Sequence, residues 1–141
     1  MKKIKIILDD GAIMPSRAHA DDAGMDIMTP IDFTVPSHGS AFIDSGLHVQ
    51  LPKNTVGFLK SKSGLNARYG ITTDGGVIDV GYNGSIRIKV YNHSDTDYKF
   101  LRGDKVTQLV ILPVVIPKEI IKVTEFPKTK RGNGGFGSSG R

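Results

Sequence analysis

The chain has no cysteine among its 141 residues, which excludes disulfide bonds and thiolate metal sites. That composition suits a reducing compartment, so we expect a cytoplasmic protein. Long apolar runs are also missing. The run from Ile6 to Leu8 ends at Asp9 and is too short for a signal peptide or a membrane-spanning helix. The histidines lie at no metal-ligand spacing. The sequence therefore predicts no membrane partner and no metal site built from cysteine or histidine.

Helical periodicity is scarce, because only residues 65–69 could form a short helical turn. Instead, 17 glycines and 7 prolines separate short runs in which apolar and polar residues alternate. In the run 85–91, three apolar side chains face one way, and Arg87 and Lys89 face the other. Further strands are expected at 3–6, 31–35, 40–43, 48–51, 55–60, 98–101, 108–112 and 120–124. Many short strands between frequent turns predict an all-β barrel or double-sheet roll.

The formal net charge is +5, which favours a polyanionic partner such as nucleic acid, an anionic membrane or a phosphorylated small molecule. The sequence has no basic helix with interleaved aromatic residues, so we expect no nucleic-acid partner. Surface lysines that serve only solubility are the alternative. Charge alone does not choose among these.

The composition changes near the C-terminus, where a basic stretch leads into a glycine-rich one. We therefore predict a β-barrel domain over 1–127 and a flexible C-terminal lid over 128–141. Glycine-rich backbone can surround phosphate oxygens with its N–H groups. Arg131 adds a cation, and the ring of Phe136 is suited to stacking on a base. A simple solvated tail is the alternative that composition favours.

The segment 76–84 is the sharpest candidate for chemistry, because glycines bracket one carboxylate and one aromatic ring. It is expected to form a hairpin whose arms hold Asp79 and Tyr82. Asp79 follows Val77 and Ile78, and a carboxylate held against apolar neighbours can act as a general base. The alternatives are a turn-forming aspartate and a tyrosine that packs at a strand edge.

Three further segments carry polar groups. Residues 61–65 precede the helical turn and combine a cation, hydroxyls and a helix start, which suits a phosphate. A plain N-cap serine is the alternative. Gln108 lies in an apolar run and needs a hydrogen-bond partner if it is buried. Asp21, Asp22 and Asp26 have the chemistry to bind a divalent ion, although their spacing matches no calcium loop.

Taken in order, five segments resemble the five motifs of the trimeric dUTPase family. They are AGMDI at 23, SKSGL at 61, GVIDVGYNG at 76, GDKVTQL at 103 and RGNGGFGSSG at 131. The resemblance implies a jelly-roll-like distorted β-barrel, a homotrimer and the hydrolysis of dUTP to dUMP and pyrophosphate. In that family, each active site takes the first, second and fourth motifs from one subunit. The third motif comes from a second subunit and the tail from the third.

The resemblance also implies roles for individual residues. Asp79 would orient and deprotonate the water that attacks the α-phosphorus, and Tyr82 would pack under the deoxyribose. Backbone groups of 73–78 would read uracil, and Phe136 would stack on it. The other substrate-binding residues would be Lys62, Ser63, Gly64, Thr73, Gly76, Val77, Ile78, Arg87, Gln108, Arg131, Gly137 and Ser138.

Mg²⁺ is the implied cofactor, bound through the triphosphate of the substrate. The resemblance places Asp26 near the water shell of this ion and not among its direct ligands. The second motif usually carries arginine where this chain has Lys62. Lysine is a point cation without the bidentate fork of arginine, so the resemblance leaves the role of Lys62 open.

Two alternatives remain at this stage. A dCTP deaminase shares the subunit fold but needs a glutamate base, and Glu119 and Glu125 both lie outside the motifs. A regulatory binding protein would keep the scaffold without catalysis, although Asp79, Tyr82 and Gln108 are all present.

Overall fold

The structure is a computed structural model that describes residues 3–135, and its regular elements are short antiparallel strands with one short helix. This confirms the all-β class. The elements are β1 (Lys5–Leu8), β2 (Gly24–Met28), β3 (Phe33–Val35), β4 (Ser40–Asp44), β5 (Leu47–Gln50), β6 (Thr55–Ser61), α1 (Ser63–Tyr69), β7 (Ile71–Asp74), β8 (Val77–Ile78), β9 (Arg87–Asn92), β10 (Tyr98–Phe100) and β11 (Lys105–Pro113).

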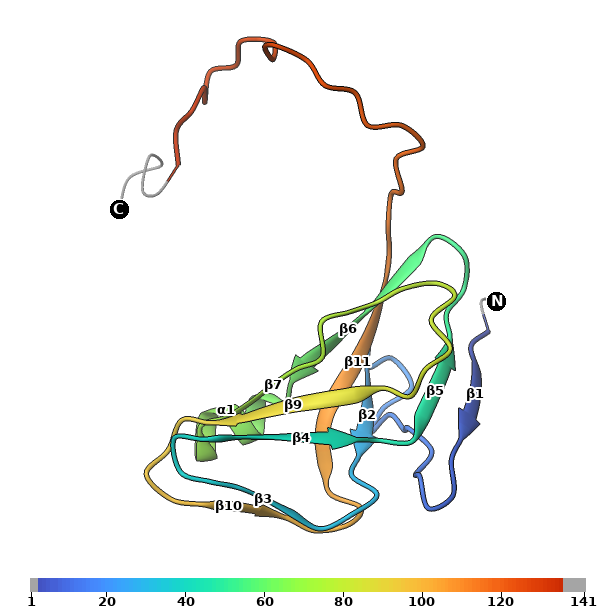
Figure 1. Ribbon diagram of the computed structural model, residues 1–141, viewed down its shortest axis with the longest axis vertical. Helices are drawn as coiled ribbons and strands as arrows, with labels where there is room; N and C mark the ends of the chain where they lie inside the picture. The colour runs from blue at the N-terminus through green and yellow to red at the C-terminus, as the bar shows by residue number, and fades with distance from the viewer. Residues whose placement is uncertain (1–2, 136–141) are drawn as a thin grey trace.

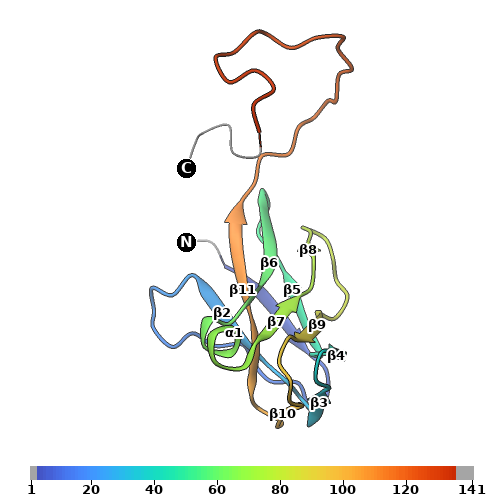
Figure 2. The same cartoon turned by 90° about the vertical axis from the view of Figure 1, so that its left-hand side faces the viewer.

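Two sheets form the body of the barrel. One has the order β2-β11-β6-β8 and the other the order β4-β9-β7, while β1 pairs with β5 and β10 with β3. The strands of one sheet run across those of the other (Figures 1 and 2). A single apolar cluster contains buried side chains from both sheets, including Leu59 and Leu109 from the first and Ile43, Ile88 and Val90 from the second. Burial of these side chains is the main force that holds the sheets together.

Strand β9 confirms the alternation expected in the run 85–91. Ile88 and Val90 are fully buried, whereas Arg87 and Tyr91 are exposed on the outer face. Asn92, also buried, satisfies its amide by donating to the carbonyl oxygens of Val35 (3.1 Å) and Thr96 (2.8 Å). The outer face of β9 is therefore free to carry polar and aromatic groups.

Strand β11 brings three of the motif segments together, because it pairs with β2 on one side and β6 on the other. Its register sets Gln108 opposite Asp26 on β2, and Thr107 opposite Ser61 on β6. The register against β2 shifts between Lys105 and Thr107. Residues far apart in the sequence thus lie side by side at one edge of the barrel.

The predicted hairpin over 76–84 is wrong. Strand β7 pairs with β9, whereas β8 pairs with β6, so the chain passes from one sheet to the other at Gly75 and Gly76. A Cβ on Gly75 would lie 2.1 Å from Leu59 Cδ1, and Gly76 has a φ of +67°. Only glycine fits both demands. Strands β7 and β8 therefore pair with strands of different sheets and not with each other. The segment that follows β8 forms a turn in place of the second arm of the predicted hairpin.

After β11 the chain leaves the barrel and runs through residues 114–135 as an irregular segment (Figures 1 and 2). The strand predicted at 120–124 is not formed. Ile120 is 96% exposed and Ile121 69% exposed, because none of the described strands pairs with this segment. The predicted division between 1–127 and 128–141 stays a prediction. Among the described residues, no helix is long and apolar enough to span a membrane.

Candidate functional site

A hollow of about 370 Å³ lies where β7, β8 and β9 meet, and we call it the Asp79 hollow. Its lining residues are Phe42, Asp74, Gly75, Gly76, Val77, Ile78, Asp79, Tyr82, Ile86, Arg87, Lys89 and Tyr91. The structure therefore brings together six of the predicted site residues, Gly76, Val77, Ile78, Asp79, Tyr82 and Arg87. The walls are aromatic and apolar with a few charged groups, which is the usual character of a site for a small organic molecule.

Asp79 is exposed at the end of β8, where its carboxylate is open to solvent. Ile78, the residue before it, is buried and pairs with Gly57 of β6. On its other side, the carbonyl of Asp79 accepts a hydrogen bond from the Tyr82 N–H at 3.2 Å. A strand and a tight turn therefore fix the backbone on both sides of an accessible carboxylate.

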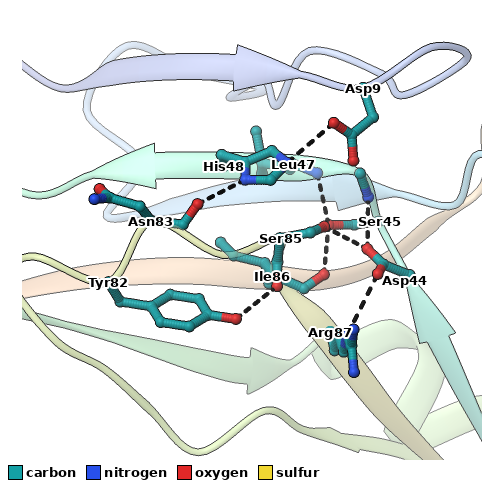
Figure 3. A network of polar contacts seen from close by, with 11 residues as sticks. Asp9, Asp44, Ser45, Leu47, His48, Tyr82, Asn83, Ser85, Ile86 and Arg87 are labelled. Atoms are coloured by element: carbon teal, nitrogen blue, oxygen red, sulfur yellow. Dashed lines mark hydrogen bonds and ion pairs between the residues drawn. The ribbon is translucent and has the colours of Figure 1, made fainter.

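Tyr82 folds back over its own loop. Its hydroxyl donates to the carbonyl of Ser85 at 3.0 Å (Figure 3). A Cβ on Gly84 would lie 2.4 Å from the tyrosine hydroxyl oxygen. The absence of a side chain at Gly84 thus allows the ring to lie flat as one wall of the hollow.

Thr73 lies on β7 and does not line the hollow. Its N–H donates to Ser61 Oγ (2.9 Å), and the Ser61 hydroxyl donates to the Thr73 carbonyl (3.3 Å). Its hydroxyl is hydrogen-bonded to that of Thr107 (2.9 Å), and both residues are buried. Thr73 therefore ties the turn before Asp79 to the other sheet.

A second hollow of about 560 Å³ lies at the edge formed by β2, β6 and β11, and we call it the lysine hollow. It is lined by Ala18, Asp22, Ala23, Gly24, Asp26, Lys60, Lys62, Lys105, Gln108 and Val110. Three lysines face two aspartates here, so the excess charge is positive. In the part of the chain that the structure describes, the two hollows have no lining residue in common.

Asp26 is the centre of the charge arrangement in the lysine hollow. It is buried, with 6% of its surface exposed, and one carboxylate oxygen accepts a hydrogen bond from Lys62. The other oxygen lies 2.8 Å from Lys105 Nζ. Burial opposes the charged carboxylate, yet the hydrogen bonds and charges of Lys105 and Lys62 keep the pKa of Asp26 below its ordinary value. Lys62 is therefore a cation held in place by a buried carboxylate.

Asp21 and Asp22 do not join Asp26 in a metal site. Asp22 instead accepts a hydrogen bond from the His19 N–H at 2.9 Å. Among residues 3–135 no cluster of three or more acidic or histidine side chains is arranged to hold a metal. The direct binding of a divalent ion that these three aspartates suggested is not supported.

Gln108 crosses the lysine hollow and donates through Nε2 to the carbonyl of Ser61 at 3.2 Å. The partner expected for this amide is thus confirmed. A Cβ on Gly24 would lie 2.1 Å from Gln108 Oε1, so the glycine leaves the space that the amide occupies. The first motif in this way shapes the position of the fourth.

Ser63 and Gly64 are exposed at the start of α1. The N-cap residue is Lys62, and its side chain makes no capping hydrogen bond. The alternative of a plain N-cap serine is therefore wrong, and this helix start is not capped by a side chain. The helix begins directly after Lys62, which lines the lysine hollow.

Arg131 lines neither hollow; its Nε donates to the carbonyl of Gly134 at 3.0 Å. Glu119 and Glu125 lie in the same irregular segment, exposed and also outside both hollows. The predicted contacts of Phe136, Gly137 and Ser138 fall outside the described residues.

Sequence reasoning missed several residues that line the hollows, namely Phe42, Lys89 and Tyr91 in one and Lys60 and Lys105 in the other. The alternation in 85–91 already placed Lys89 on the face that carries Arg87, and the structure adds Tyr91 to that face. Phe42 pairs with Lys89 across β4 and β9, which no local pattern reveals.

Three comparisons relate the chain to known proteins. A family model described as dUTPase matches residues 10–140. The deoxyuridine 5'-triphosphate nucleotidohydrolase of Eremothecium gossypii is 38% identical over 131 residues, 93% of this chain and 86% of that protein. The mitochondrial protein of that name from Dictyostelium discoideum is 40% identical over 133 residues, 94% and 74% respectively.

Solved structures agree with these relatives. The dUTPase of Staphylococcus bacteriophage 80alpha with dUPNHPP has a TM-score of 0.92 and 30% identity, with 100% of both chains covered. A mutant dUTPase of S. aureus phage phi11, described with a structural Mg(II) ion, has a TM-score of 0.81 and 29% identity. That match covers 89% of this chain and 99% of the phage chain.

Proposed function

The chain belongs to the dUTPase family and is a dUTP-hydrolysing enzyme, and from that premise we propose how its residues carry out the reaction. Asp79 accepts a proton from a water molecule as the water oxygen attacks the α-phosphorus of dUTP. The bond from the α-phosphorus to the oxygen that bridges to the β-phosphorus breaks, and pyrophosphate leaves with that oxygen. The observation that carries this role is an accessible carboxylate beside Tyr82, fixed by β8 and by the turn.

The Asp79 hollow is the proposed site of the nucleoside. Tyr82 packs under the deoxyribose, where a ribose 2′-hydroxyl would clash with the ring. Backbone groups of the turn that precedes Asp79 pair with the uracil edge, and the narrow turn leaves no room for the 5-methyl group of thymine. Rejection of a base that leaves buried polar groups unpaired can reach roughly 10⁴-fold.

The lysine hollow is the proposed site of the phosphates. Its excess positive charge and the Gln108 amide suit phosphate oxygens. The first N–H groups of α1, at Ser63 and Gly64, lie beside it. Lys62 supplies a point charge in place of the usual arginine, and Asp26 holds it in position.

The nucleoside and the phosphates are divided between two copies of the chain in this proposal. Among residues 3–135 the two hollows share no lining residue, and we propose that each site combines the Asp79 hollow of one subunit with the lysine hollow of another. Exposed apolar side chains beyond β11 need cover in such an assembly. They are Val115, Ile116, Ile120, Ile121, Val123 and Phe126. A homotrimer, with the tail residues Arg131, Phe136 and Ser138 supplied by the third chain, fits both observations.

Enzymes of this family use Mg²⁺, and we propose that the ion enters with the triphosphate. The donor chemistry of the chain fits that route, because both carboxylate oxygens of Asp26 already accept from lysines and residues 3–135 contain no cluster of metal ligands. Asp26 would face the water shell of the ion only. When bound, the ion neutralises phosphate charge.

The rates of pyrophosphate release from dUTP, dCTP, UTP and dTTP test the proposed recognition of the base and the sugar. Rapid release from dUTP alone is expected. Ammonia release from dCTP would indicate the deaminase alternative. A deaminase needs a glutamate base in its site, and Glu119 and Glu125 both lie outside the two hollows. Tight binding of dUTP without turnover would indicate a regulatory binding protein.

A further inference from the structure

A histidine outside both hollows contacts the segment that carries Tyr82. His48 lies on β5, and 23% of its side chain is exposed. Its Nδ1 lies 2.8 Å from the carbonyl oxygen of Asn83, and its Nε2 lies 3.1 Å from a carboxylate oxygen of Asp9 (Figure 3). The ring thus bridges the residue after Tyr82 and the residue after β1.

Both atoms that face the ring of His48 are acceptors only. A carbonyl and a carboxylate oxygen each need an N–H, and a neutral imidazole has one. The two contacts are therefore satisfied together only by the imidazolium cation. The hydrogen bond to the Asn83 carbonyl, and then that to Asp9, raise the pKa of His48 above its ordinary value.

Other charged groups near His48 come from the neighbouring strands. Asp44, at the end of β4, adds a favourable negative charge. Arg87 partly offsets it, because its Nε lies 3.4 Å from Asp44. Lys5 on β1 lines the same shallow hollow as His48 and Asn83 and opposes the cation. The hydrogen bonds to the Asn83 carbonyl and to Asp9 are the main causes of the raised pKa of His48, and the charge of Asp44 adds least.

The segment between Asp79 and Ser85 is held at three places. At its start, the Tyr82 N–H donates to the Asp79 carbonyl. At its end, the Ser85 hydroxyl donates to Asp44, whose pKa this hydrogen bond helps keep below its ordinary value. The middle is held from outside by His48 through the Asn83 carbonyl (Figure 3).

We propose that His48 is a positioning residue that, when protonated, holds Asn83 and through it the turn from Asp79 to Tyr82. The sign follows from the two contacts. The link is complete at a pH below the pKa of His48. As the pH rises through that value, the remaining proton stays on Nε2, because the charged carboxylate of Asp9 is a stronger acceptor than a carbonyl, and the contact with Asn83 is lost. The consequence for catalysis rests on the proposed function of Asp79 and Tyr82, whereas the link itself does not.

The link can be tested without substrate by NMR on the full chain between about pH 5.5 and 8.5. The His48 ring nitrogens should titrate with a midpoint above the ordinary value of roughly 6.5. The amides of Tyr82, Asn83 and Gly84 should titrate with the same midpoint. In His48→Gln the amide titration should vanish. A ring midpoint at or below the ordinary value, or amides that do not follow the ring, would overturn the proposal.

Two variants sharpen that measurement. Asp9→Asn removes the carboxylate and should lower the midpoint of His48 and of the amides together. His38→Gln is the matched control, because His38 also pairs with an aspartate, Asp95, at 2.7 Å. This control should leave the amide titration unchanged.

Kinetics test the positioning role. At low pH, kcat/KM of His48→Gln should be roughly 3- to 10-fold lower than that of the unmodified enzyme, the size expected for a lost hydrogen bond. The ratio of the two values is therefore well below one. It should approach one at high pH, where the unmodified enzyme has lost the same contact. His38→Gln should give a ratio near one throughout. A ratio for His48→Gln that does not vary with pH would overturn the positioning role, whereas no dUTP hydrolysis by the unmodified enzyme would overturn only the proposed function.

Discussion

The Asp79 hollow and the lysine hollow are built on different principles. The first depends on turns, three glycines and a folded-back tyrosine, and the carboxylate of Asp79, the proposed base, is exposed. The second depends on three neighbouring strands and a buried carboxylate between two lysines. The first is suited to recognising the shape of a nucleoside, and the second to holding charge. Changes in one should therefore alter selectivity and chemistry, and changes in the other should alter phosphate binding and acid stability.

The largest effect is expected at Asp79. Asp79→Asn keeps the size of the side chain but removes the proton acceptor, so turnover should fall by roughly 10²–10⁴ while dUTP binding is largely kept. Steady-state kinetics together with calorimetric titration of a non-hydrolysable dUTP analogue give both values. Asp95→Asn, at an exposed aspartate that lines neither hollow, is the matched control. Near-normal turnover in Asp79→Asn would remove this residue from the role of base.

Removal of the tail should have the next largest effect. Deletion of residues 131–141 removes no described residue of the apolar cluster, so the melting temperature should change little. Turnover should collapse, because a closing lid excludes water and completes the site. Phe136→Ala should be milder, since one base–ring stack contributes about 1–3 kcal/mol. Full activity after the deletion would make the tail a solvated terminus, and gross unfolding would make it a packed segment.

A change at Gly84 tests the shape of the Asp79 hollow. The added Cβ of Gly84→Ala would lie 2.4 Å from the Tyr82 hydroxyl oxygen, so the ring must move. We expect a rise in KM for dUTP of roughly 10-fold and weaker rejection of UTP, because the wall under the sugar is displaced. Tyr82→Phe keeps the ring and loses only the hydrogen bond to Ser85, so its effect should be smaller. Equal effects of both substitutions would indicate that the ring position does not matter.

The smallest effect is expected for the stability of the protein at acid pH, to which Asp26 of the lysine hollow contributes. The pKa of Asp26 is lowered in the folded protein, so its contribution to stability is present above the unfolded value of about 3.9 and is lost as the pH falls through the folded value. Asp26→Asn should lower the free energy of unfolding by about 1 kcal/mol at neutral pH, since both lysines are partly exposed and screened. Once the pH falls below the folded pKa of Asp26, the variant and the unmodified protein should converge. Urea unfolding across this pH range measures the difference in the free energy of unfolding between the variant and the unmodified protein, with Asp21→Asn as the exposed control. If that difference does not change with pH, the ion pairs of Asp26 are not its cause.

Local patterns predicted those parts of the fold that depend on neighbouring residues in the chain. The alternation in 85–91 gave the two faces of β9, and the position of the short helix was also foreseen. Strand partners were not, because pairing joins distant segments. The paired arms expected after Gly76 and the strand expected at 120–124 failed for this reason. The run at 120–124 has suitable residues but no partner among the described strands.

The candidate site shows the same division. The residue types in the motifs pointed to Asp79, Tyr82 and Gln108 before any geometry was known. The role of Lys62 could not be predicted, because its partner Asp26 lies 36 residues away in the sequence. The two hollows become visible only once the sheets are assembled.

The central claim is that one active site takes its two hollows from two subunits, and mixed trimers test it most directly. Asp79→Asn and Gln108→Ala each damage one hollow, and each variant alone should be nearly inactive. Light scattering should first give three times 15.2 kDa for the unmodified chain. After both variants are unfolded together and refolded at equal amounts, about a quarter of the sites should combine two undamaged hollows and regain dUTP turnover. Turnover that stays at the level of the separate variants, in trimers shown to be mixed, would contradict the shared site.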